Sequence, residues 1–331
     1  CIASVSNVFA KNTISDDKFR QLEENLPTPN TYRTASGAPG HQYWQQDVDY
    51  KIDIKLADAK QTLSGSETID YTNNSPDTLR YLWLQLDQNR LAKNAGSKTT
   101  STAPSKKMTY SGLRGAIASD EFHGGYDITK VTGSNGKALH YVINGTMMRV
   151  DLPKSLKSGD SIELNINWNY QLHEQKVLGG RSGYEYFKED DNYLYEVAGW
   201  FPRAAAYYDV MGWQNKQFIG SGEFTLEFGD YDVSITVPAD HVVAATGELQ
   251  NPKDVLTKTQ RNRLAKAKKA KKPVLVITPE EALENEKSRS TKTKTWEFEA
   301  KNVRDFAFAS SRKFIWDAQG YKGGKTNTMA M

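Results

Sequence analysis

Five histidines are the side chains best suited to hold a metal ion or move a proton at neutral pH. They are His41, His123, His140, His173 and His241. A zinc-binding helix of the HExxH type needs two histidines four residues apart, with a glutamate after the first that reaches the metal-bound water. The nearest match, His173-Glu174, is followed by Gln-Lys-Val and no second histidine. The sequence therefore predicts no metal site of ordinary spacing in this chain.

Motifs for other chemistries are equally incomplete. No Gly-x-Ser-x-Gly elbow is present, and the glycine-rich stretches at 133–136 and 220–222 are typical of turns. The Gly-Gly-Lys-Thr at 323–326 lacks the leading glycine of a phosphate loop. Acids and aromatics do lie together in YEYFKEDD at 184–191, as sugar hydrolysis would require, but a solvated loop explains this composition more simply. We expect no catalytic residue in this chain.

Cys1 is the only cysteine, which excludes an internal disulfide. A chain that begins at cysteine, followed by small and polar residues such as Ala3 and Ser4, is typical of a mature bacterial lipoprotein. An artificial boundary within a longer protein is the alternative explanation. The lipoprotein hypothesis predicts a lipid on Cys1 and a location at the bacterial cell envelope, periplasmic or lipid-anchored. No segment approaches the roughly 18 apolar residues of a spanning helix, so we expect contact with a membrane only through that anchor.

The charge balance gives little reason to expect a polyanionic partner. The chain carries 43 basic and 40 acidic residues, so no field extends over the whole molecule to collect nucleic acid. A local basic run at 261–272 has no aromatic side chains between its charges, as base stacking would need. A solvated helix face is the favoured interpretation, and we expect no nucleic-acid partner.

Strict alternation of apolar and polar residues begins at Asp47 and predicts a half-buried β-strand. Its apolar face consists of Val48, Tyr50, Ile52, Ile54 and Leu56. The same period recurs at 148–152, 162–170, 224–228, 231–237, 296–300 and 306–308. Turn-forming residues separate these runs. We therefore expect a mainly β fold, a large antiparallel saddle-like sheet or sandwich.

One segment breaks the β pattern. Residues 254–291 include an Ala-rich and Lys-rich run from Thr257 to Lys272, and Pro279 opens a second helical turn. The composition predicts a small helical insertion between strands. The expected organisation is a tether at 1–40, a β-rich domain at 41–312, and at 313–331 the start of a connection to a further domain.

The region after Tyr193 resembles a known family. The resemblance rests on YLYEVAGWFPRAAAYYDVMGWQN at 193–215, GSGEFTLEFGDYDVSITVP at 220–238 and VVAATGEL at 242–249, and it extends to HQYWQQ at 41–46, LWLQLDQN at 82–89 and RDFAFASS at 304–311. In order and spacing these blocks are similar to the amino-terminal domain of gluzincin zinc aminopeptidases, the family of aminopeptidase N and leukotriene-hydrolase-like enzymes, in its bacterial envelope branch.

That resemblance implies a function completed elsewhere. Family members continue into a catalytic domain with a Gly-x-Met-Glu-Asn segment and HExxH, and the sequence ends at Met331 before either. Zinc is therefore expected in the full-length enzyme, while none is expected on this chain. The missing catalytic domain and peptide substrates are the expected partners, and this chain alone is expected to be inactive.

The resemblance also implies three substrate-binding residues. In relatives the amino-terminal domain lends an acid or amide to the substrate's free α-ammonium, and the position before the Pro202-Arg203 turn places Glu196 there. Trp200 and Phe201 would line the adjoining subsite or pack in the core. We therefore expect a substrate-capping domain of a metallo-aminopeptidase that releases amino-terminal residues from peptides. The alternative is an envelope β-sandwich module that binds carbohydrate or peptide.

Overall fold

The structure of the protein is a computed structural model. It describes residues 29–100, 107–220, 222, 224–323 and 326–330. Cys1, the expected lipidation site, lies outside these residues. The chain divides into two compact units, Cys1–Trp44 and Gln45–Met331. The described part of the first unit is a turn in which Thr34 N donates to Ala38 O at 2.9 Å.

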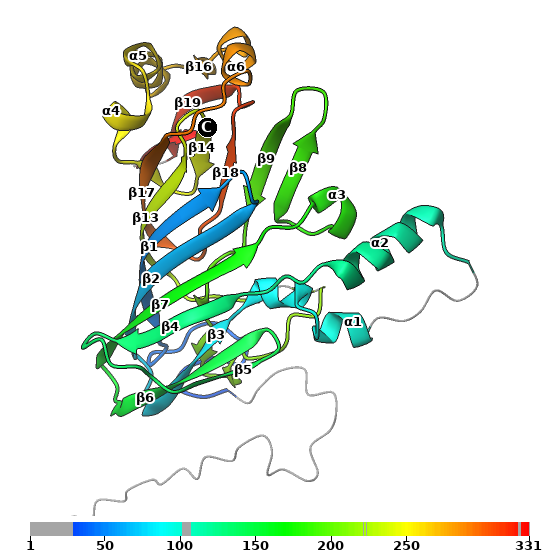
Figure 1. The fold of residues 1–331 in the computed structure, drawn as a ribbon. Helices are drawn as coiled ribbons and strands as arrows, with labels where there is room; N and C mark the ends of the chain where they lie inside the picture. Colours follow the sequence, from blue (N-terminus) through cyan, green and yellow to red (C-terminus); the bar gives the residue numbers. More distant parts are fainter. Residues whose placement is uncertain (1–28, 101–106, 221, 223, 324–325, 331) are drawn as a thin grey trace, which may run out of the picture. The chain divides into compact units, whose positions relative to one another are not determined.

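The largest element of the second unit is a seven-stranded sheet (Figure 1). Its spatial order is β15 (Glu248–Leu249), β17 (Thr293–Val303), β13 (Gly229–Pro238), β1 (Asp47–Ala57), β2 (Thr62–Thr72), β7 (Ser161–Gln171) and β4 (Asp127–Gly133). The alternation predicted for β1 is confirmed, since its five apolar side chains are all buried. The pairing of β1 with β13 is parallel, whereas its pairing with β2 is antiparallel. The sheet is therefore mixed. A parallel pair is possible here because the chain between β1 and β13 is long enough to form a crossover connection.

Four smaller sheets are present among the described residues. One has the order β10 (Arg203–Ala204), β3 (Leu79–Gln85), β6 (Met147–Leu156), β5 (Tyr141–Asn144). Another has the order β14 (Val242–Ala245), β18 (Phe308–Ser311), β9 (Asn192–Val197), β8 (Gly183–Phe187). The others are β11 (Tyr207–Tyr208) with β12 (Gly212–Trp213), and β16 (Val274–Ile277) with β19 (Trp316–Gly323) and β20 (Thr326–Ala330). The prediction of a mainly β fold is confirmed.

One large hydrophobic core joins these sheets. Aromatic side chains fill much of it, and several meet edge to face, a favourable geometry for their quadrupoles. Gly65 on β2 lies opposite Trp168 on β7, and a Cβ on Gly65 would meet Trp168 Cζ2 at 2.6 Å. The indole therefore occupies the place where a side chain at position 65 would stand.

The predicted helical insertion is present between β15 and β17. It contains α4 (Pro252–Val255), α5 (Lys258–Ala267) and α6 (Pro279–Asn285). Capping boxes start α5 and α6, with Thr257 paired to Gln260 and Thr278 to Glu281. The strand β16 interrupts the insertion, which the composition did not indicate. In the basic run, Arg263 pairs with Glu281 at 2.6 Å.

The remaining helical elements lie around β3 and β8. They are the 3-10 helix η2 (Asp87–Leu91), α1 (Gly96–Thr100), α2 (Tyr110–Glu121) and α3 (Gln175–Leu178). None of the helices in the described part of the chain is both long and apolar enough to cross a bilayer. Of these elements, η2 matters most for the site, because it follows β3 directly and carries Asp87 and Arg90.

Candidate functional site

Glu196 lies on β9, an inner strand of the sheet that also contains β14, β18 and β8. Its direct partners across the sheet are Gly183 on β8 and Ala309 on β18. Directly opposed residues project from the same face, so the neighbours of the Glu196 side chain on that face are small. Glu196 is exposed, and no other described residue forms a hydrogen bond or an ion pair with its carboxylate. A charged group without a described partner is thus presented on a paired, rigid strand.

Trp200 and Phe201 are both fully buried. The Trp200 indole Nε1 donates to Phe306 O at 2.8 Å, and its ring meets those of Phe201 and Phe308 at 4.8 and 5.5 Å between centroids. Both side chains therefore pack in the core, one of the two locations expected from the sequence. Their contribution to a substrate subsite stays a prediction.

Arg203 fixes the turn that follows these aromatics. Its guanidinium forms ion pairs with Asp87 on η2 and with Asp305, the latter at 2.6 Å. Burial alone would lower the pKa of Arg203, but the two facing carboxylates more than offset it and raise the pKa. On the strand β10, Arg203 is the backbone partner of Gln85 at the end of β3. This pairing places Arg203 beside η2, which follows β3. The segment from Glu196 to Arg203 is therefore anchored at its far end.

The loop between Glu196 and Arg203 is also held at Gly199. Gln88 Nε2 donates to Gly199 O at 2.9 Å, and Tyr126 OH donates to the same oxygen at 3.3 Å. Gly199 has φ of 55°, which favours glycine. These contacts position the residues that follow the exposed carboxylate, and no local sequence pattern indicated them.

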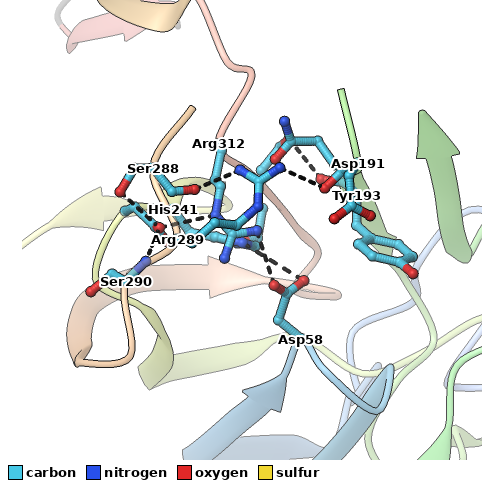
Figure 2. Close-up of polar contacts among 12 residues, drawn as sticks. Asp58, Asp191, Tyr193, His241, Ser288, Arg289, Ser290 and Arg312 are labelled. Atoms are coloured by element: carbon cyan, nitrogen blue, oxygen red, sulfur yellow. Dashed lines mark hydrogen bonds and ion pairs between the residues drawn. The ribbon is translucent and has the colours of Figure 1, made fainter. Parts of the chain in front are cut away.

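Figure 2 shows a second polar cluster, which includes Arg312. Arg312 is 4% exposed. Arg312 pairs with Asp58 after β1 at 2.9 Å and with Asp240 after β13 at 3.0 Å. Asp240 also accepts from Ser288 Oγ at 3.1 Å and Ser290 N at 2.6 Å. We call Asp58, Asp240, His241 and Arg312 the buried ionic junction. No local motif indicated it, because its members come from three distant segments of the chain.

Most of the histidines have structural partners. His173 is buried, its Nε2 lies 2.9 Å from Gly179 O, and burial lowers its pKa. His241 Nδ1 lies 2.8 Å from Ser310 Oγ, and the exposed His140 pairs with Asp151. Within the described ranges, no three His, Cys, Asp or Glu side chains are grouped so that they could hold a metal ion. We assign no chemical step through zinc to these residues.

Comparison with known proteins found matches only among solved structures. No protein-family model matches the sequence, and neither does any curated protein. An M1 zinc metallopeptidase from Deinococcus radiodurans aligns with 14% identity and a TM-score of 0.42, over 82% of this chain and 43% of that one. A mutant of it bound to a Tyr-Ser-Ala substrate aligns with 13% identity and a TM-score of 0.43, over 86% and 46%. The chain spans less than half the length of these structures.

Proposed function

We propose that this chain is the amino-terminal, substrate-capping part of a zinc metallo-aminopeptidase and that Glu196 binds the free α-ammonium of the peptide. The observation that carries the proposal is the exposed carboxylate of Glu196, unpaired among the described residues and flanked on its sheet by Gly183 and Ala309. The family resemblance of residues 193–215 supports the same role.

The chemistry of the ammonium group explains why a carboxylate would be used. An ammonium has three donors and no acceptor, and removing it from water is costly unless an anion pairs with it. A charge-assisted hydrogen bond contributes about 1.5–3 kcal/mol. Because Glu196 is on a strand paired on both sides, its backbone is already ordered when the carboxylate accepts that bond. An acetylated amino terminus would lose the charge and most of this energy.

Hydrolysis is assigned to a further domain. In the proposed enzyme, zinc bound there would activate the attacking water. The part contributed by this chain is to bind the amino terminus of the peptide and to fix the position of the first residue. The isolated chain is therefore expected to give no chelator-sensitive turnover of aminoacyl arylamides in the presence of zinc, and robust turnover would contradict the assignment.

The direct test is the substitution Glu196→Gln, which keeps the shape and removes the charge. Calorimetric titration of the chain with Ala-Ala-Ala-amide should show binding about tenfold weaker for the variant, in line with the loss of one charge-assisted bond. Acetyl-Ala-Ala-Ala-amide should bind both proteins equally weakly. Glu297→Gln, at an exposed position of β17, is the matched control. Equal affinity of wild type and Glu196→Gln for the free amine would rule out the role of Glu196.

The alternative function, an envelope module that binds carbohydrate or peptide, has one observation in its favour. Tyr184, Tyr186 and Tyr193 form a partly exposed cluster on β8 and β9, with centroids 5.7 and 4.9 Å apart around Tyr193. Aromatic faces of this kind are suited to stacking on sugar rings. Titration with neutral oligosaccharides discriminates the two functions, because tight binding that a Tyr186→Ala substitution abolishes would favour the module.

A further inference from the structure

A cavity of about 490 Å³ lies beside the loop that follows Glu196. Its lining includes Ser182, which precedes β8, and Ala198 and Gly199, which follow β9. Among the described residues, the lining also contains charged side chains of both signs, namely Arg90, Arg181, Arg203 and Arg304 with Asp87 and Asp305. We call this cavity the arginine pocket. Guanidinium groups in a cavity favour an anionic ligand where no carboxylate pairs with them.

The two aspartates do not neutralise the whole pocket. Both of them pair with Arg203. Arg90 forms no ion pair with any described residue, and its guanidinium makes one long contact, Nη2 to Gly179 O at 3.4 Å. Arg304 is exposed, and its guanidinium likewise has no partner in the part of the chain that the structure describes. Two guanidinium groups therefore keep most of their donors available.

Arg90 is the more informative of the two, because it is half-buried. Burial lowers the pKa of Arg90, because the charged guanidinium is partly removed from water. The charge of Asp87 raises the pKa but offsets only part of this effect. Gly180, with φ of 100°, lies against it, and a Cβ there would be 2.2 Å from Arg90 Nη2. The glycine thus makes room for the guanidinium. A partly desolvated cation with unused donors in a cavity is suited to bidentate binding of a carboxylate.

Part of the lining of the arginine pocket is apolar. It consists of Phe218, Phe224 and Leu226, and the two phenylalanine rings meet edge to face at 5.8 Å. A ligand that carries one anionic group and some aliphatic surface would match both parts of the lining. A peptide with a carboxylate has this composition, whereas a bare inorganic anion would leave the apolar part of the lining uncovered.

The spacing between Glu196 and the pocket also suits a peptide. Ala198 is two residues along from Glu196 and lines the cavity, a separation of about 7 Å in extended chain. A free peptide of two or three residues spans about 7 to 10 Å when extended. Its ammonium could therefore reach Glu196 while its carboxylate lies in the cavity.

We propose that the arginine pocket binds a peptide carboxylate through Arg90 and Arg304. That the ligand is a peptide rests on the proposed function, whereas the binding of an anion by the two arginines does not. The carboxylate has two possible sources, the free carboxyl terminus of a short peptide or an acidic side chain near its amino terminus. Both sources present a carboxylate to the guanidinium groups. Two different acetylated peptides distinguish one source from the other.

The experiment titrates the 331-residue chain with acetylated probes, which lack the ammonium and so do not depend on Glu196. The probes are acetyl-Ala-Ala with a free carboxylate, acetyl-Glu-Ala-amide and acetyl-Ala-Ala-amide. We expect at least one carboxylate probe to bind about tenfold more tightly than the neutral amide, with an affinity that falls as salt is added. Whichever of the two carboxylates binds identifies the source. Equal affinity for all three probes would overturn the proposal.

The variants locate the site. Arg90→Met and Arg304→Met should each weaken the binding of the carboxylate probe about tenfold. Because Arg304 is exposed, its substitution should leave the fold intact. Arg80→Met removes the same charge from the exposed face of β3 and is the matched control. If both pocket variants bind like the wild type, the assignment is wrong. If Glu196→Gln changes nothing for free amines while the pocket variants act, the capping role fails and the arginine pocket stands.

Discussion

At the scale of single residues, burial gives His241 a property that an exposed histidine lacks. Its side chain is fully buried, with Nδ1 at 2.8 Å from Ser310 Oγ and Nε2 at 3.9 Å from Asp58 Oδ1. Burial lowers the pKa of His241 to about 4, helped by the charge of Arg312 and opposed by Asp58 and Asp240. The folded protein therefore keeps this imidazole neutral where the unfolded chain would protonate it.

The sign of the pH dependence follows from this shift. Between pH 6.5 and 4 the unfolded chain binds more protons at His241 than the folded protein, so stability falls as the pH falls through this range. From pH 7 to pH 5 the loss attributable to His241 is about 2 kcal/mol. Urea unfolding at the two pH values should show a smaller difference in His241→Asn than in wild type.

The control for this prediction is His140, whose side chain is 72% exposed. His140→Asn should leave the difference between the two pH values close to that of wild type. An acid loss of stability that is equally large in His241→Asn would show that other groups cause it. Burial raises the pKa of Glu227 to about 7, so Glu227 changes the pH dependence of stability in the opposite direction. For this reason the variants are compared with one another, and not wild type alone at two pH values.

At the scale of elements, the contact of Gly65 with Trp168 gives a sharp test of packing between β2 and β7. Gly65→Ala would place a methyl group 2.6 Å from Trp168 Cζ2 and 3.0 Å from Ile54 Cγ2. Overpacking of this kind costs about 1–3 kcal/mol. Thermal unfolding should show a lower midpoint for the variant.

A matched control exists at Gly136, where a Cβ would meet nothing within 4 Å, although its φ is 73°. Gly136→Asn should be tolerated, because asparagine accepts the left-handed conformation better than other residues. If Gly65→Ala is as stable as the wild type, the Trp168 indole can move aside.

The elements also show how far sequence reasoning reaches. Alternation identified β1 and its buried face, because a half-buried strand imposes a period of two on its own residues. It did not reveal the parallel partner β13, since pairing depends on distant residues. The helix α2 was missed because none of its residues is buried and no apolar face had to form. Glu196 was predicted through a family resemblance and its role stays a prediction, whereas Arg90 and Arg312 gave no local signal.

At the scale of the whole second unit, the buried ionic junction ties distant segments together. Arg312 follows β18, Asp58 follows β1, and Asp240 follows β13, so one guanidinium joins the ends of strands from two sheets. Tyr195 OH on β9 donates to Asp58 Oδ1 at 2.7 Å and adds a further strand. Removing the cation leaves two carboxylates with fewer partners and close to one another.

We predict that Arg312→Met destabilises the protein by about 3–5 kcal/mol, the usual cost of removing one partner from a buried ion pair. Chemical denaturation measures this change. The control is Arg149→Met, which breaks an exposed pair with Asp151 and should cost about 0–1 kcal/mol. Similar losses for both variants would contradict a special role of the junction.

The parallel pairing of β1 with β13 also has a kinetic consequence. Asp230 N donates to Asp49 Oδ1 across 181 residues of sequence. At about 5–20 residues per second of synthesis, the strand β1 would wait about 10 to 40 s for its partner. During that time one edge of the hairpin formed by β1 and β2 is open to other chains. Polar residues at every second position of β1, including Asp49, Lys51, Asp53 and Lys55, keep that open edge charged while the partner is being made.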